Sequence, residues 1–203
     1  NGEMIPWEDA QIHVLTHTLH YGMGVFEGIR AYETSNGPAI FRLREHMDRM
    51  LNSAKILLMP LPYTSEELQD AAKQVVRDSG LDSCYVRPIA YYGYGEMGLA
   101  TSSCTVDVAI ACWPWGAYLG EDAATKGVRM KISSWVRHDH NIMPPASKTT
   151  GNYANSTLAK MEALQAGYDE AIMLNKEGLV AESSSAQARS RARCLAIADS
   201  HPR

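Results

Sequence analysis

The chain has 203 residues, of which 45% are hydrophobic and 21% charged, values typical of a soluble globular protein that buries a core. The formal net charge of −4 argues against nucleic acid as a partner, because phosphate binding requires a basic face. No apolar run approaches the length that crosses a bilayer and no charged-then-apolar leader opens the chain, so no membrane contact and a cytoplasmic location are expected.

In chain order, the first expected elements are a hairpin and a helix. The β-rich runs 25–32 and 38–42 are joined by 34–37, which contains the Asn-Gly pair typical of hairpin turns. A helix follows and stops before Pro60. Its inward residues, at helical spacing, are predicted to be Leu43, Met47, Met50, Leu51, Ala54 and Leu58.

A second helix and two strands complete this half. The helix begins at Thr64, where Glu67 forms a capping box, and it ends at Gly80. The residues expected to face inward are Leu68, Ala71, Val75 and Val76. The segments 84–92 and 105–112 are rich in β-branched and aromatic residues and predict strands.

The second half predicts a strand, a helix and another hairpin. Alternation from Val128 to Ser134 indicates the strand, and the helix runs from about Asn152 to Gly167. The hairpin consists of 171–174 and 179–181. One helix face carries three large apolar residues that are expected to face the core, namely Leu158, Met161 and Leu164.

These elements predict an α+β protein of two domains. Residues 1–118 would form a small N-terminal α+β domain, 119–127 an interdomain connection, and 128–182 part of a larger domain. Residues 183–203 are biased towards serine and arginine without a clear period, so this tail is expected to be disordered.

The cysteines and histidines do not indicate a metal site. His138 and His140 form an i, i+2 pair in an expected loop, where solvated histidines are more common than metal ligands. His13, His17 and His20 would share a helix face, but no Glu or Cys accompanies them at ligand spacing. No Cys-x-x-Cys spacing occurs, and reduced thiols are expected at Cys84, Cys104, Cys112 and Cys194.

Lys148 is the first residue that could carry chemistry. It lies in a small, uncharged neighbourhood just before a helix, where partial desolvation lowers the pKa of an ammonium group. A neutral amine attacks an aldehyde to form a Schiff base. From the local sequence alone, however, a surface lysine at the end of a loop is the more common arrangement.

Four other residues have two interpretations each. Arg49 could bind a phosphate, although it lies away from the apolar stripe of its helix and a solvated arginine is the usual case. Tyr85 and Arg87 share a strand face suited to a carboxylate, whereas an arginine in a strand is often an ion-pair partner. Glu182 ends a hairpin strand, either as a buried carboxylate or at an exposed edge.

Several separated motifs occur together in one order. They are 17–22 (His-Thr-Leu-His-Tyr-Gly), 25–32 (Val-Phe-Glu-Gly-Ile-Arg-Ala-Tyr), 41–47 (Phe-Arg-Leu-Arg-Glu-His-Met), 85–88 (Tyr-Val-Arg-Pro), 113–118 (Trp-Pro-Trp-Gly-Ala-Tyr), 147–153 (Ser-Lys-Thr-Thr-Gly-Asn-Tyr) and 167–171 (Gly-Tyr-Asp-Glu-Ala). Through them the chain resembles the class IV aminotransferases of fold type IV, the D-amino-acid aminotransferase-like fold, over about nine tenths of its length. The resemblance is strongest to the branched-chain amino-acid aminotransferases.

The resemblance implies pyridoxal 5′-phosphate as cofactor, with four residues around it. Lys148 would be the Schiff-base lysine and the proton carrier, and Tyr153 would lie near the ring hydroxyl. Arg49 would bind the phosphate, and Glu182 would face the pyridine nitrogen and keep it protonated.

The resemblance also implies how substrates are held. Tyr85 would lie near the substrate α-carboxylate, and Arg87 would accept the side-chain carboxylate of glutamate. The apolar lining for a Leu, Ile or Val side chain would be Tyr21, Phe26, Trp115 and Tyr118. The implied reaction is transamination of branched-chain L-amino acids with 2-oxoglutarate. A homodimer is implied because the family's loop equivalent to 95–99 crosses into the neighbouring subunit's site.

The resemblance stops beside Glu182, where 183–187 (Ser-Ser-Ser-Ala-Gln) departs from the family's Gly-Ser-Gly-like turn. About the last third of the family's chain is absent, so the large domain is expected to be incomplete, through a shifted reading frame or a truncated gene. Two alternatives follow. One is a different activity on the same fold, as in D-amino-acid aminotransferase or aminodeoxychorismate lyase, and the other is a catalytically inactive fragment.

Overall fold

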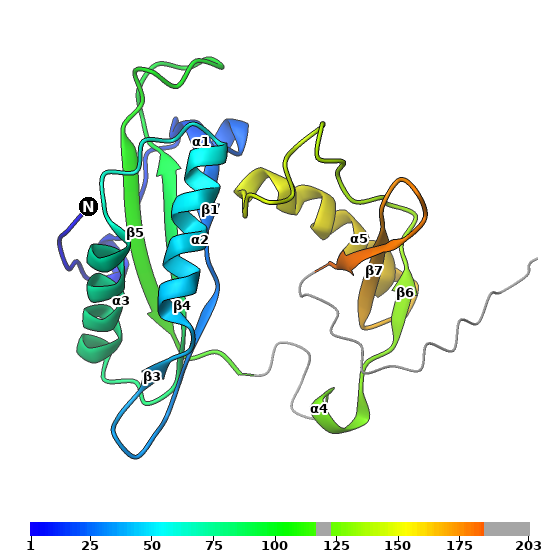
Figure 1. The fold of residues 1–203 in the computed structure, drawn as a ribbon, viewed down its shortest axis with the longest axis horizontal. Coiled ribbons are helices and arrows are strands. Elements are labelled where there is room, and N and C mark those ends of the chain that lie inside the picture. The colour runs from blue at the N-terminus through cyan, green and yellow to red at the C-terminus, as the bar shows by residue number, and fades with distance from the viewer. Residues whose placement is uncertain (117–122, 185–203) are drawn as a thin grey trace, which may run out of the picture.

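The computed structural model describes residues 1–116 and 123–184 and has the expected α+β character (Figure 1). The described residues form a five-stranded antiparallel sheet and, in the second half of the chain, a three-stranded sheet. The two sheets lie in separate halves of the view, each with its own helices. Among the described residues, no helix has both the length and the apolar character that spanning a membrane requires.

The five-stranded sheet is centred on β4 (Cys84–Tyr92), which pairs with β5 (Val106–Trp113) along one edge. Its other edge pairs with β1 (Gly24–Phe26) and then β2 (Ile29–Tyr32), and β3 (Ala39–Ile40) extends the sheet as the predicted hairpin partner of β2.

The run 25–32, predicted as one strand, is therefore broken at Glu27 and Gly28. The break lies opposite Pro88, which has no N–H to continue the ladder.

Two helices cover one face of this sheet. Helix α2 (Leu43–Ile56) buries Met47 and Met50 completely against the core. The prediction that Leu58 faces inward is wrong, because the helix ends at Ile56 and Leu58 takes a left-handed conformation (φ 55°) with 87% of its surface exposed. Leu57 and Met59 are buried in its place.

Helix α3 (Ser65–Ser79) has the predicted boundaries. Its capping box is formed, since the Glu67 amide donates to Thr64 Oγ1 and the Thr64 amide donates to the Glu67 carboxylate. The inward face consists of Leu68, Ala72 and Val76. The expected inward position of Ala71 is wrong by one residue, since Ala71 is exposed.

The second sheet holds β6 (Met130–Ile132) parallel to β7 (Glu170–Leu174), with β8 (Val180–Ser183) antiparallel to β7 in the predicted hairpin. Helix α5 (Tyr153–Gln165) packs on β7 through the small side chains of Ser156, Ala159 and Ala163.

The expectation for the large residues of α5 is wrong. Leu158, Met161 and Leu164 are 46%, 48% and 47% exposed, respectively. Small side chains allow the helix to lie close to the strand, so the larger face is turned away from it.

Short elements complete the described residues: η1 (Trp7–Asp9), α1 (His17–Tyr21), α4 (Ala123–Lys126) and η2 (Thr150–Asn152). Cys84, Cys104 and Cys112 are free thiols. The expectation that the disordered tail begins at Ser183 is wrong, because Ser183 ends β8 and both Ser183 and Ser184 are buried. Residues 185–203 of the predicted tail, with Cys194, and Tyr118 lie outside the described residues.

Candidate active site

The segment that carries Lys148 is fixed between β1 and α2, although it is distant from both in sequence. The Phe26 amide donates to the Lys148 carbonyl over 3.1 Å, and Val25 forms a β-bridge with Thr149. The Lys148 amide donates to Ser53 Oγ of α2 over 3.0 Å. These bonds place the Lys148 backbone against the first sheet rather than in a free loop.

The Lys148 side chain is half-buried and its amine has a phenol partner. Lys148 Nζ donates to Tyr153 Oη over 2.7 Å and lies 5.0 Å from the centre of the Phe26 ring. None of the ion pairs found in the described residues joins Lys148 to a carboxylate. The alternative of an ordinary surface lysine does not describe this setting, because the amine is packed among aromatic rings.

Four predicted substrate residues form one continuous wall beside this amine. The Phe26 ring lies 4.8 Å from the Tyr153 ring, and the Arg87 guanidinium lies 4.7 Å above Phe26. Arg87 Nη2 donates to Tyr85 Oη over 3.3 Å, and Trp115 packs on Tyr85 at 4.4 Å.

The alternation of β4 explains why Tyr85 and Arg87 share this wall. Successive side chains of a strand point to opposite faces, and Val86 between them is fully buried in the core with α2 and α3. Arg87 Nε is also buried and has no hydrogen-bond partner among the described atoms. A buried N–H of this kind requires an acceptor, which a ligand carboxylate would provide.

Arg49 is not the solvated arginine that its helix position indicates. It donates through Nε to Glu27 Oε1 over 2.6 Å and through Nη2 to Glu27 Oε2 over 2.5 Å. His46 Nδ1 lies 2.9 Å from the same carboxylate, which is fully buried. Burial by itself raises the pKa of Glu27, but the hydrogen bonds from Arg49 and His46 outweigh it and lower the pKa from its ordinary value of 4.5.

Glu27 and His46 are the site residues that sequence reasoning missed. The signal that could have found them is Glu27 itself, a carboxylate in the mostly apolar run 25–32. A carboxylate that is buried in such a strand requires a partner. His46 and Arg49 lie three residues apart on α2, so both side chains reach the same side of the helix.

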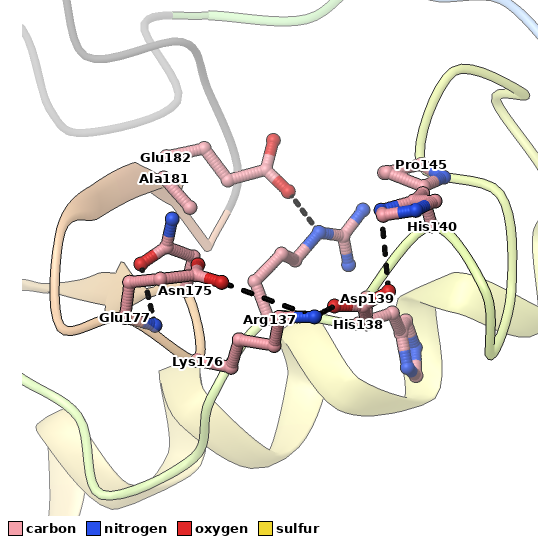
Figure 2. Close-up of a pocket in the computed structure, with 10 residues that line it drawn as sticks. All are labelled: Arg137, His138, Asp139, His140, Pro145, Asn175, Lys176, Glu177, Ala181 and Glu182. Carbon is pink, nitrogen blue, oxygen red and sulfur yellow. Dashed lines mark hydrogen bonds and ion pairs between the residues drawn. The ribbon is translucent and has the colours of Figure 1, made fainter.

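Glu182 lines a cavity of about 390 Å³ in the second half of the chain, together with residues 137–140 and 175–177 (Figure 2). Its carboxylate is 33% exposed and forms an ion pair with Arg137, so it is neither fully buried nor unpaired. Arg137 Nη1 also lies 3.5 Å from the Asn152 carbonyl oxygen. Arg137 thus links Glu182 to the turn that follows Lys148.

Of the two other predicted lining residues, the described one, Tyr21, is not brought into this wall. Tyr21, on α1, packs on His17 at 4.6 Å, and no ring contact in the described part of the chain joins it to Phe26 or Tyr153. Tyr118 lies outside the described residues. Within residues 1–116 and 123–184, no group of three His, Cys, Asp or Glu side chains could hold a metal ion.

Comparisons with known proteins identify relatives of this chain. The branched-chain-amino-acid aminotransferase of Pseudomonas aeruginosa is 52% identical over 184 residues, covering 91% of this chain and 60% of that protein. The crystal structure of the Escherichia coli branched-chain amino acid aminotransferase superposes with a TM-score of 0.88 at 45% identity, covering 91% of this chain and 61% of that one.

A crystal structure of the branched-chain aminotransferase from Thermoproteus uzoniensis with norvaline has a TM-score of 0.85 at 46% identity, covering 90% of this chain and 61% of that one. The chain therefore spans about three fifths of the length of the relatives that it matches. The family model described as Amino-transferase class IV matches residues 24–187. The chain belongs to the class IV aminotransferase family.

Proposed function

We propose that this chain transaminates branched-chain L-amino acids with 2-oxoglutarate, giving branched-chain 2-oxo acids and L-glutamate, with pyridoxal 5′-phosphate as cofactor. The observation that carries the proposal is the Lys148 amine, held by the Tyr153 hydroxyl beside the Phe26 ring. Support comes from relatives named branched-chain aminotransferases, one of them in complex with N-(5′-phosphopyridoxyl)-L-glutamate and one with norvaline.

The described side chains fit this cofactor. Arg49 has donors for a phosphate, Tyr153 has a hydroxyl beside the amine, and Glu182 has a carboxylate for the pyridine nitrogen. When bound, pyridoxal phosphate supplies an aldehyde for amino groups and a ring that accepts the electrons released at the substrate Cα.

Each residue has a role in this proposal. Lys148 Nζ takes the proton from the substrate Cα and returns it, and Tyr153 Oη orients that amine. Arg137 holds the Glu182 carboxylate through their ion pair, and a carboxylate facing the pyridine nitrogen would favour the protonated form of that nitrogen.

The wall of aromatic and charged side chains suits two kinds of substrate. Phe26 and Trp115 offer apolar surface to a Leu, Ile or Val side chain, and we also assign Tyr21 and Tyr118 to this lining. Tyr85 would hold the α-carboxylate. Arg87, with its buried unpartnered Nε, would accept the second carboxylate of glutamate.

The assembly and domain organisation are part of the same proposal. We propose a homodimer, which the exposure of Met97 (40%) and Leu99 (87%) in the 95–99 loop favours, because burying them requires another surface. We also propose the domain ranges 1–118 and 128–182 and a cytoplasmic location, which the three free thiols favour.

The test is borohydride reduction of the chain with pyridoxal phosphate, followed by peptide mapping. Selective labelling of Lys148 is expected, and Lys148→Ala is the control that should lose it. Labelling spread over exposed lysines such as Lys55 and Lys126 would contradict the proposal. Transfer from L-leucine to 2-oxoglutarate, compared with transfer from D-alanine, then tests the substrate class.

A further inference from the structure

We propose that Glu27, supported by His46, is a positioning residue that fixes the Arg49 guanidinium so that its Nη1 edge binds the cofactor phosphate. The inference rests on the proposed function, because it assigns a role towards the cofactor of that site. None of the sequence motifs implies a role for Glu27.

Glu27 binds only one edge of the Arg49 guanidinium. Glu27 accepts from Nε and from Nη2, at 2.6 and 2.5 Å, in a two-point contact. A guanidinium has five N–H donors in one plane, so about three remain, two on Nη1 and one on Nη2. These donors point away from Glu27 and form a second edge that suits the oxygens of a phosphate.

The Glu27 carboxylate is itself held in a fixed position. The Glu27 side chain is fully buried, its amide donates to the Pro88 carbonyl over 2.9 Å, and His46 holds Oε2. Arg49 is 46% exposed and long, so without this anchor it would sample many rotamers. Glu27 therefore supplies the fixed point from which Arg49 is oriented.

Arg49 lies close to the segment that carries the amine. The Lys148 amide donates to Ser53 Oγ over 3.0 Å, and Ser53 lies one turn after Arg49 on the same face of α2. Arg49 thus lies on the face of α2 that holds the Lys148 segment, as the phosphate and the aldehyde of one cofactor require.

The charge of Glu27 and the orientation that it gives to Arg49 predict opposite effects of its removal on phosphate binding. The negative charge of Glu27 partly cancels the charge of Arg49, so removing it increases the attraction for phosphate if charge alone matters. Orientation predicts the reverse, because a guanidinium without its anchor must be ordered when phosphate binds. A buried Gln amide group would also turn an N–H towards the Arg49 donors.

The experiment compares pyridoxal phosphate with pyridoxal, which lacks the phosphate, by absorbance titration of the 203-residue chain. The Kd for pyridoxal divided by the Kd for pyridoxal phosphate measures the contribution of the phosphate to binding. We expect Glu27→Gln to reduce this ratio about ten-fold, the effect of losing roughly one charged hydrogen bond, with the Kd for pyridoxal unchanged. Glu170→Gln is the matched control, because Glu170 is an equally buried glutamate away from Arg49, and it should leave the ratio unchanged.

Glu27→Asp keeps the charge but shortens the side chain, so it should reduce the ratio about three-fold, and it replaces Glu27→Gln if that variant does not fold. An unchanged or increased ratio in the folded variant overturns the inference. Borohydride labelling separates the two proposals. If the unmodified chain labels Lys148 and the ratio does not respond to Glu27, only the positioning role fails, and if Lys148 is not labelled, both fail.

Discussion

Gly28 provides a sharp test of the geometry around Tyr85. A Cβ atom at Gly28 would lie 2.0 Å from Tyr85 Oη and 3.0 Å from Cζ, so Gly28→Ala requires the ring to move. The ring is held by Trp115 at 4.4 Å, by Trp113 at 5.2 Å and by the Arg87 bond. We expect a loss of about 1–3 kcal/mol in the free energy of unfolding, the usual cost of overpacking a constrained site.

The assay is urea denaturation followed by tryptophan fluorescence, performed as a double-mutant cycle. Tyr85→Phe removes the oxygen at 2.0 Å but leaves Cζ at 3.0 Å, so Gly28→Ala should cost less in that background without becoming neutral. Gly116→Ala is the matched control, because no atom lies within 4 Å of a Cβ built there. It should change stability by less than about 0.5 kcal/mol.

Two results would refute this reasoning. The first is a Gly28→Ala variant that is no less stable than Gly116→Ala, and the second is an equal cost with Tyr85 and with Phe at position 85. Either would mean that the Tyr85 hydroxyl does not occupy the space beside Gly28.

Three further outcomes are expected. Tyr153→Phe removes the partner of Lys148 Nζ, so borohydride labelling at Lys148 should slow and spread to exposed lysines, which peptide mapping would show. Unchanged selectivity for Lys148 would argue against the role of the hydroxyl. Because folding lowers the pKa of Glu27 below 4.5, its stabilisation is present above that pH and is lost as the pH falls through the folded value. Urea midpoints between pH 6 and pH 3 should therefore fall less steeply for Glu27→Gln than for the unmodified chain, and parallel slopes would contradict this. Met161→Gln on the exposed face of α5 should change the unfolding free energy by less than about 0.5 kcal/mol and should reduce self-association measured by light scattering. A large destabilisation would place Met161 in the core.

The sequence predicted those features that depend on neighbouring residues. The capping box at Thr64, the boundaries of β4 and the hairpin of β7 and β8 follow from local signals and were confirmed. The errors occurred where packing competes with periodicity. Leu58 falls just beyond the helix end, and α5 turns its small residues rather than its large ones towards β7.

Within the candidate site, the motifs predicted most of the residues but not their partners. Phe26, Tyr85, Arg87 and Lys148 do lie together, as expected from the resemblance. Glu27, the carboxylate that holds Arg49, stands in the 25–32 motif but was assigned no role, because it is 22 positions from Arg49. No spacing rule for a strand or a helix covers such a pair.

The amino-acid sequence by itself determined the order and type of the main elements and the family, and it predicted the lysine of the candidate site. Only the tertiary structure decided which charges are neutralised, where the first strand breaks and which face of α5 packs. The physical reason is that periodicity records whether a residue is apolar, whereas a buried charge is stabilised by the particular donors that the fold brings within about 3 Å.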